Sequence, residues 1–330
     1  MYKEMITTFC MLCLFGLNTY ANPLIFKNYV IFGDSLTDVG NYTTNSNNCI
    51  YFNAPITSHT QDAKSRYTNT TWANAGELKN TLASNDGGSN YAVAGYTSAQ
   101  ILTSVKNYRI NHQADPNALY IVWAGTNDVL YAIGNHWSDE EVKQALVDGT
   151  NNVILSLSNL YDMGARNFLV IGLMDLSQTP MSSYPHAEQS VLLGVFPNKE
   201  DKLRLQQACS EWNSHLFFNA LQSSQNKLKL FKNKHSDSQI YAWNPTKLLA
   251  DMIKNPTRYG YPEQLAFNTQ NSKIQDMHYP TAQVTYCGNT AKNADRNSDH
   301  YMFYNFIHPT PSVYNIMEQD MINNATELQS

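Results

Sequence analysis

The sequence predicts an α/β fold, with a mostly parallel β-sheet covered by helices on both faces. Short runs of consecutive apolar residues recur along the chain, which is typical of strands buried on both sides. Longer stretches with helical periodicity separate these runs, and this alternation is the order expected of a parallel sheet. At 330 residues, 42% of them hydrophobic, the chain is long enough to bury a substantial core.

Three apolar runs are predicted as buried strands. They cover residues 29–32, 118–123 and 168–172, and Gly33 ends the first of them. A weaker strand is expected at residues 228–231.

Four segments are predicted as helices, at residues 98–108, 138–163, 199–221 and 312–328. Asp139 and Glu140 lie in the first turn of the second segment, where the helix dipole favours negative charge.

Two stretches, residues 41–90 and 255–296, are polar and poorly periodic. We interpret them as long loops over the sheet rather than as separate domains, because loops that leave the carboxyl ends of strands commonly form sites. The expected organisation is therefore a single domain over residues 22–330.

The first 21 residues have the features of a secretory signal peptide. Lys3 precedes an apolar run at residues 6–17, and Ala21 supplies a small residue before a cleavage point. The run is shorter than the roughly 20 residues that a membrane-spanning helix needs. We expect export to the periplasm or the extracellular space.

Charge and cysteine content exclude several classes of function. A net charge of −5 gives no basic surface, so nucleic acid is not an expected partner. No cofactor is expected, and His278 and His300 lie in polar loops without ligand geometry, so no metal is expected either. Cleavage of the signal peptide leaves three cysteines, which allow at most one internal disulfide whose pairing stays open: Cys49, Cys209 and Cys287.

Ser35 follows the first strand directly, on the turn that begins at Gly33 and Asp34. A serine at the carboxyl end of a strand can expose its hydroxyl, and it becomes a nucleophile only with a base within hydrogen-bonding reach. The alternative is that Asp34 and Ser35 simply cap the next helix.

Two further segments supply hydrogen-bond donors, at residues 90–95 and 123–128. The backbone N–H of Gly95 and the side-chain amide of Asn127 could stabilise a developing oxyanion. Both segments could also be ordinary turns, because glycine and asparagine are turn residues.

His308 lies just before the last helix, and Pro309 and Pro311 stiffen the backbone after it. Such a loop can direct an imidazole, although a histidine in a surface loop is the simpler interpretation of this segment alone.

Taken together in this order and spacing, the segments resemble the GDSL (SGNH) hydrolase family. The matching blocks are Gly33-Asp34-Ser35-Leu36, residues 90–95, Gly125-Thr126-Asn127-Asp128 and Ile307-His308-Pro309-Thr310. Secondary matches are Arg66-Tyr67-Thr68-Asn69 and the Gly164-Ala165-Arg166 approach to the third strand.

The resemblance implies a three-layer α/β/α sandwich with about five strands, in the flavodoxin-like class. It also implies Ser35 as nucleophile and His308 as general base. The oxyanion hole would consist of the N–H groups of Ser35 and Gly95 and the side chain of Asn127. Asp34 and Asp128 would hold loops in place.

This sequence departs from the family three residues before His308, where Asn305 replaces the usual aspartate. Asn305 could orient the imidazole through its amide oxygen. A nearby carboxylate, with Asp299 the first candidate, or a backbone carbonyl could do so instead. The third hypothesis is a protein that has lost hydrolysis and kept binding. Ala94 and Tyr96 also replace smaller residues, and we expect them to crowd the second block.

The amino-acid sequence of the first block resembles that of bacterial family members of the phospholipase A, lysophospholipase and glycerophospholipid-cholesterol acyltransferase types. The expected substrate is therefore a lipid ester, with transient contact to a membrane or micelle surface and no obligate protein partner. The alternatives are a carbohydrate acetyl-esterase and a catalytically weak binding protein.

Overall fold

The structure is a computed structural model, and it describes residues 26, 28–38, 90–179, 182, 199–217, 226–261, 302, 307–309 and 311–329. Several predicted features lie outside these residues. They are the signal peptide, most of the two long loops, Arg66-Tyr67-Thr68-Asn69, Cys49, Cys287, His278, Asp299, His300 and Asn305.

A five-stranded sheet runs through the described residues, in the order β1-β2-β3-β4-β5. The first four strands are parallel, and the short fifth strand pairs antiparallel with the fourth. The strands are β1 (Tyr29–Gly33), β2 (Leu119–Trp123), β3 (Asn167–Ile171), β4 (Gln239–Trp243) and β5 (Thr326–Glu327). The predicted fold class, with a mostly parallel sheet of about five strands, is confirmed.

The chain returns to the outer edge of β1 at Asn90, which forms a parallel bridge with Ile31. Tyr91 N–H donates to the Ile31 carbonyl and Val93 N–H to the Gly33 carbonyl. The second predicted block therefore lies beside β1 on the edge that β2 does not use, as a flavodoxin-like order requires.

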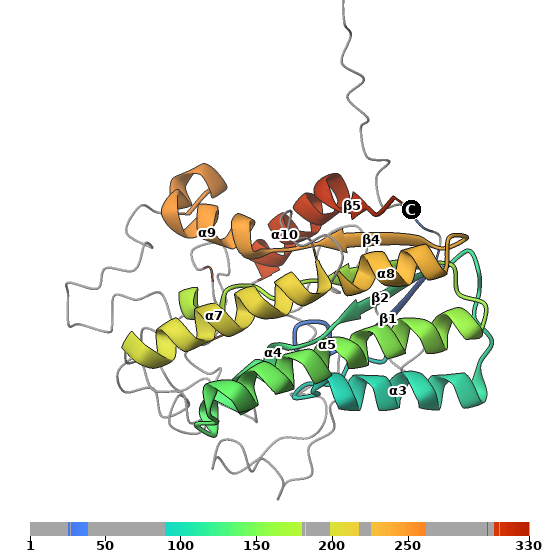
Figure 1. Cartoon of the computed structure of the whole chain (residues 1–330). Helices are drawn as coiled ribbons and strands as arrows, with labels where there is room; N and C mark the ends of the chain where they lie inside the picture. Colours follow the sequence, from blue (N-terminus) through green and yellow to red (C-terminus); the bar gives the residue numbers. More distant parts are fainter. Residues whose placement is uncertain are drawn as a thin grey trace, which may run out of the picture.

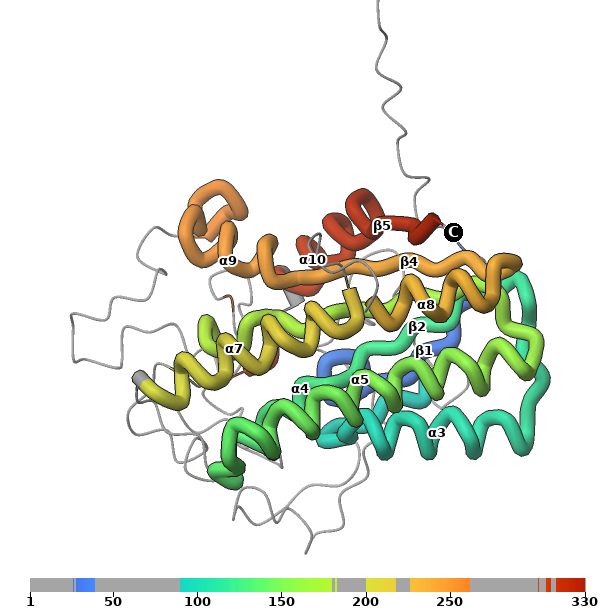
Figure 2. Tube along the Cα trace, viewed as in Figure 1, coloured from blue at the N-terminus to red at the C-terminus, as the bar shows by residue number. Residues whose placement is uncertain are grey.

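Seven α-helices lie in the described part of the chain: α3 (Ser98–Asn111), α4 (Thr126–Gly134), α5 (Asp139–Asp162), α7 (Lys199–Leu216), α8 (Lys227–Lys234), α9 (Thr246–Lys254) and α10 (Pro311–Asn324). The long α5 begins with a capping box, in which Ser138 N–H donates to the Glu141 carboxylate and Glu141 N–H donates to Ser138 Oγ. Figure 2 shows α3 and α5 running side by side.

Helices cover both faces of the sheet. On one face, the Phe168 ring meets the edge of Phe231 in α8, with 5.9 Å between ring centroids. On the other face, Trp243 Nε1–H donates to the Asp320 carboxylate of α10 over 2.8 Å. Figure 1 shows α5 and α8 on one side of the sheet and α10 on the other. Every residue of β2 and β3 is buried, which explains their uninterrupted apolar sequences.

The weaker strand predicted at residues 228–231 is wrong, because these residues belong to α8. Alternating lysine and leucine imitates the period of a half-buried strand. The buried residues are instead Leu228, Phe231 and Lys232, which have helical spacing, and Leu230 is 52% exposed. Asn226 caps the helix by accepting a hydrogen bond from Lys229 N–H.

The fourth strand is β4, and neither it nor the helices α4 and α9 are predicted from the sequence. The last helix also ends earlier than predicted, at Asn324, and the chain then forms β5. The long loop expected from residue 255 begins with a short 3-10 helix, Pro256–Tyr259.

Gly125 links β2 to α4 in a conformation that suits only glycine. Its φ is +113°, and a Cβ atom built there would lie 2.4 Å from the buried ring of Trp212 in α7. The ring also lies against Gly149 of α5, where a Cβ would again approach it to 2.4 Å. The absence of a Cβ atom at these two glycines therefore leaves the space in which the Trp212 ring packs between α4, α5 and α7.

Gly125→Ala is expected to lower the free energy of unfolding by roughly 3 kcal/mol, because it adds left-handed strain to overpacking. Urea denaturation measures this loss. Gly260→Ala is the matched control, because its φ is +85° and no described atom lies within 4 Å of the added Cβ. Equal losses in both variants would show that packing against Trp212 contributes nothing.

None of the helices in the described residues is both long enough and apolar enough to cross a membrane.

Candidate active site

The parallel strands of the sheet end together at one edge. Gly33 of β1 lies in register with Trp123 of β2, which pairs with Ile171 of β3, and Ile171 in turn pairs with Trp243 of β4. The segments that follow these strands therefore meet in space, although they are far apart in the sequence. Two of these segments are the first and third predicted blocks.

Ser35 lies on a tight turn immediately after β1. The Asp34 carbonyl accepts hydrogen bonds from the N–H groups of Thr37 and Asp38. The Asp34 carboxylate accepts one from Leu36 N–H at 2.9 Å. Asp34 thus shapes the turn through its side chain, as expected of a residue that holds a loop.

The Ser35 hydroxyl faces His308. Ser35 Oγ lies 2.7 Å from His308 Nε2, and the two residues are 8% and 2% exposed. The serine therefore does not use its side chain as a helix cap, and the histidine is not a surface residue. This distance allows direct proton transfer between the two side chains.

Gly95 lies on the loop between the β1 edge and α3, in a left-handed conformation with φ +83°. No described residue accepts a hydrogen bond from the N–H of Ser35 or of Gly95. Within the described residues, both backbone N–H groups therefore have no hydrogen-bond acceptor.

Asn127 lies in the first turn of α4, next to Gly125. One N–H of its amide donates to the Tyr96 carbonyl at 2.9 Å, which fixes the plane of the amide and leaves the second N–H for another acceptor. The Asn127 side chain is thereby joined to the loop that carries Gly95.

Asp128 has a holding role. Its carboxylate accepts hydrogen bonds from Ser98 N–H at 2.8 Å and from Ser98 Oγ at 2.6 Å. Burial raises the pKa of Asp128 above its usual value. These bonds join the start of α4 to the start of α3.

The expected crowding around Ala94 and Tyr96 is not seen in the described part of the chain. Ala94 is 7% exposed and packs into the core, and Tyr96 packs against the same core. No described atom lies within 4 Å of a Cβ built on Gly95.

Burial raises the pKa of the Asp34 carboxyl to about 7, well above its ordinary 3.8, although the hydrogen bond from Leu36 N–H opposes the rise. The nearby carboxylates of Asp128 and Asp38 add to it, while the neighbouring Thr126 hydroxyl lowers it. Within the described residues, neither the Thr126 hydroxyl nor Asp34 Oδ2 has a hydrogen-bond partner, so the two groups are not hydrogen-bonded to each other.

A raised pKa means that the folded protein holds the Asp34 proton more tightly than the unfolded chain does. The stabilisation is present below about pH 4 and is lost as the pH rises to about 7. Asp34→Asn should remove this slope, which is on the order of 4 kcal/mol at most. Urea denaturation of both proteins between pH 4.5 and 8 measures it, and parallel stability curves would contradict the assignment.

The described residues contain no cluster of three or more histidine, cysteine or acidic side chains that could hold a metal ion. Cys209 of α7 is buried as a free thiol, and burial raises its pKa to about 12. A thiol so rarely ionised is a packing residue rather than a nucleophile.

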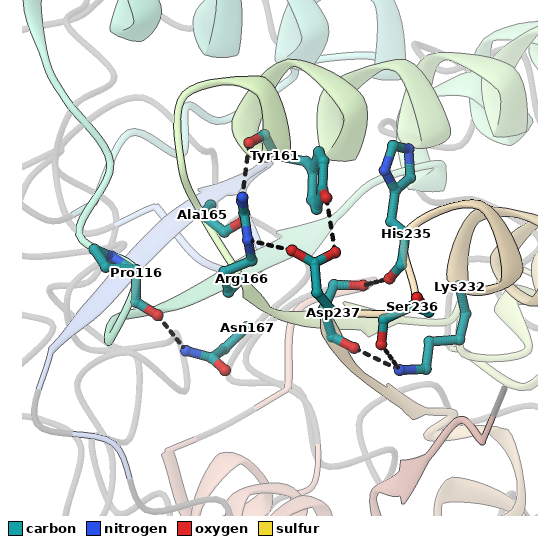
Figure 3. Close-up of polar contacts among 10 residues, drawn as sticks. Pro116, Tyr161, Ala165, Arg166, Asn167, Lys232, His235, Ser236 and Asp237 are labelled. Atoms are coloured by element: carbon teal, nitrogen blue, oxygen red, sulfur yellow. Dashed lines mark hydrogen bonds and ion pairs between the residues drawn. The ribbon is translucent and has the colours of Figure 1, made fainter.

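Arg166 of the secondary match lies at the opposite end of the sheet, just before β3 (Figure 3). Its guanidinium forms a 2.8 Å ion pair with Asp237, which also accepts a hydrogen bond from Tyr161 OH. The guanidinium lies over the Tyr161 ring, 4.2 Å from the centroid. This cluster joins the end of α5 to the turn before β4, so its role is structural.

The sequence of this chain is similar to that of known ester hydrolases. The profile of the family described as GDSL-like Lipase/Acylhydrolase matches residues 29–321. An Acetylesterase of Thermothelomyces thermophilus is 29% identical over 49% of this chain and 47% of the relative. Lipase 1 of Photorhabdus luminescens is 24% identical, and the alignment covers 92% of this chain and 51% of the relative. A GDSL esterase/lipase of Arabidopsis thaliana is 26% identical over 62% and 52%.

The chain thus spans about half the length of these relatives. The family match, in contrast, extends from β1 to α10 and includes every strand of the parallel sheet. The chain therefore belongs to the GDSL-like lipase/acylhydrolase family.

Proposed function

We propose that the protein is an exported serine esterase that hydrolyses acyl esters of lipids through an acyl-enzyme on Ser35. The observation that carries this proposal is the 2.7 Å contact between Ser35 Oγ and His308 Nε2 at the carboxyl edge of the sheet. The family membership gives the contact its chemical meaning.

In the proposed reaction, His308 Nε2 takes the hydroxyl proton while Ser35 Oγ attacks the acyl carbonyl. The carbonyl oxygen becomes an oxyanion, which accepts hydrogen bonds from the N–H groups of Ser35 and Gly95 and from the Asn127 amide. The ester C–O bond then breaks, and His308 returns the proton to the departing alcohol. Water then attacks the acyl-enzyme carbonyl while His308 takes a proton from it. The bond to Ser35 Oγ breaks, His308 returns the proton to the serine, and the acid is released. Another alcohol in place of water would make the reaction an acyl transfer.

An imidazole acts as a base at Nε2 when Nδ1 carries the other proton and is held by an acceptor. We propose Asn305 as that acceptor through its amide oxygen, with Asp299 or a backbone carbonyl as the alternative.

Asn305→Asp is expected to keep or raise kcat, because a carboxylate at this position would also stabilise the imidazolium. Steady-state kinetics on a p-nitrophenyl ester measures it, with Asp299→Ala assayed in parallel. An unchanged rate in Asn305→Asp together with a collapse in Asp299→Ala would transfer the orienting role to Asp299. A sharp loss in Asn305→Asp would contradict both assignments.

Lipid esters are the favoured substrate for two reasons. The first block resembles the corresponding sequence of bacterial lipid-acting members, and the alignment with Lipase 1 covers 92% of this chain. The second candidate, a carbohydrate acetyl-esterase, is favoured by the relative named Acetylesterase. We propose phospholipids or lysophospholipids as the lipid class, bound transiently at a membrane or micelle surface.

Export is proposed from the N-terminal segment, with cleavage after Ala21 leaving one domain over residues 22–330. Amino-terminal sequencing of the protein recovered outside the cytoplasm tests it. A mature protein that begins at Met1 would contradict this.

The function is tested with p-nitrophenyl esters from acetyl to palmitoyl and with a panel of phospholipids and lysophospholipids, comparing wild type with Ser35→Ala. Hydrolysis of long acyl chains that disappears in Ser35→Ala supports the lipid esterase. A strict preference for acetyl groups would support the acetyl-esterase instead. If no ester is hydrolysed but lipid binding is retained, the protein would be a binding protein that has lost hydrolysis, the hypothesis suggested by Asn305 in place of the usual aspartate.

A further inference from the structure

We propose that Asp38 is a positioning residue that aims the Gly95 N–H at the oxyanion, and this inference rests on the proposed function. The Asp38 carboxylate is fully buried, and its Oδ2 accepts a hydrogen bond from Ala94 N–H at 2.8 Å. Ala94 directly precedes Gly95, so the carboxylate fixes the peptide next to the proposed donor.

Asp38 is also tied to the turn that carries Ser35. Its own N–H donates to the Asp34 carbonyl at 3.0 Å, on the turn that Asp34 closes. Asp38 therefore connects the turn of the nucleophile, through its backbone N–H, with the peptide that precedes the oxyanion donor, through its side chain. A buried charged acceptor makes this bond stronger than a neutral one would.

The loop is held at both ends and at Tyr96, whose carbonyl accepts from the Asn127 amide, so the Asp38 bond acts on the one peptide that directly precedes the Gly95 peptide. At the start, Asn90 donates to the Thr37 carbonyl at 2.9 Å and accepts from Ala92 N–H at 3.0 Å. At the end, the Asp128 carboxylate holds Ser98.

Between these anchors, Gly95 has φ +83° and Tyr96 N–H closes a turn onto the Val93 carbonyl. Loss of the Asp38 bond would leave the Ala94 peptide to rotate while the anchors stay in place. The expected defect is a misdirected Gly95 N–H in a folded protein.

Three variants of the full chain test this: Asp38→Ala, Asp38→Asn and, as the matched control, Asp175→Ala. Asp175 is 5% exposed and lies on the segment after β3. Its carboxylate accepts hydrogen bonds from Ser177 N–H at 3.0 Å and from the Gln178 amide at 2.9 Å, and none of its hydrogen bonds in the described residues reaches the Gly95 loop. The measurements are kcat and KM on p-nitrophenyl butyrate and the Ki of a trifluoromethyl ketone. This ketone forms a tetrahedral oxyanion adduct with an active serine.

We expect Asp38→Ala to lower kcat by roughly 30- to 100-fold, part of the effect of deleting one oxyanion donor. KM should change less than about threefold, and the ketone Ki should rise by the same factor as kcat falls. Asp38→Asn keeps an acceptor oxygen and should stay within about fivefold of wild type. Asp175→Ala should retain wild-type kcat and Ki.

Equal losses in Asp38→Ala and Asp175→Ala, or a fall in kcat without a rise in Ki, would show that Asp38 is only structural. If Asp38→Ala does not fold, Asp38→Ser replaces it under the same criteria, because the shorter hydroxyl does not reach Ala94 N–H. A wild-type protein that neither turns over esters nor binds the ketone would overturn the proposed function. A normal wild type with an unaffected Asp38→Ala would overturn this inference alone.

Discussion

Replacing Ser35 by alanine is expected to lower kcat for ester hydrolysis by roughly 10⁶-fold, the loss seen when a nucleophile of this type is removed. The variant lacks the oxygen that lies 2.7 Å from His308 Nε2, so no acyl-enzyme can form. Binding should change little, because the Gly95 and Asn127 donors and the loops around them are kept. Initial rates on a p-nitrophenyl ester and the Kd of a non-hydrolysable ether analogue measure the two effects.

The fold should survive this change, because Ser35 contributes no side-chain hydrogen bond to the turn in the described residues other than the contact to His308. A Ser35→Ala protein with more than about 1% of wild-type turnover would exclude Ser35 as nucleophile. Loss of both activity and the unfolding transition would instead assign Ser35 a structural role.

Replacing His308 by alanine is expected to cause a loss of similar size, because a serine hydroxyl without a base is a weak nucleophile at neutral pH. The two residues act as a unit, so their effects should not add. The double variant Ser35→Ala/His308→Ala should therefore be no slower than the slower single variant. If the fold-losses in kcat of the two single variants multiplied in the double variant, Ser35 and His308 would act independently, and proton transfer between them would be contradicted.

The matched control for His308 is His235, a second histidine in the described chain. The His235 ring is tilted against the Tyr161 ring, with 4.0 Å between ring centroids (Figure 3). His235 precedes β4 and therefore lies at the opposite end of the parallel sheet from the Ser35 turn, which follows β1. His235→Ala should leave kcat within about twofold of wild type. A comparable loss in this variant would show that general destabilisation, rather than removal of a base, explains the His308 result.

The elements predicted correctly from the sequence are those whose residue pattern matches their burial or their position in a helix. The buried strands β1, β2 and β3 have continuous apolar runs, and α5 has acidic residues in its first turn. The order of the blocks also indicated that Ser35 and His308 belong to one site, although 273 positions separate them.

Other features depend on contacts that no local pattern reveals. In α8, the lysine and leucine alternation imitates a strand, and only the burial of Phe231 and Lys232 shows the helical face. Asp38 lies three residues after Ser35 in the sequence, yet its bond to Ala94 exists only because the chain returns to the edge of β1. Gly125 is required because Trp212, 87 residues later, packs against it.

Active-site labelling with a fluorophosphonate, followed by peptide mass spectrometry, tests most directly whether His308 activates Ser35. The reagent bonds to an activated serine oxygen and releases fluoride. We predict one label per chain, on Ser35, absent from Ser35→Ala and slowed by at least roughly 10³-fold in His308→Ala. A label on a different serine, or ester hydrolysis that persists after the label has saturated Ser35, would contradict the account.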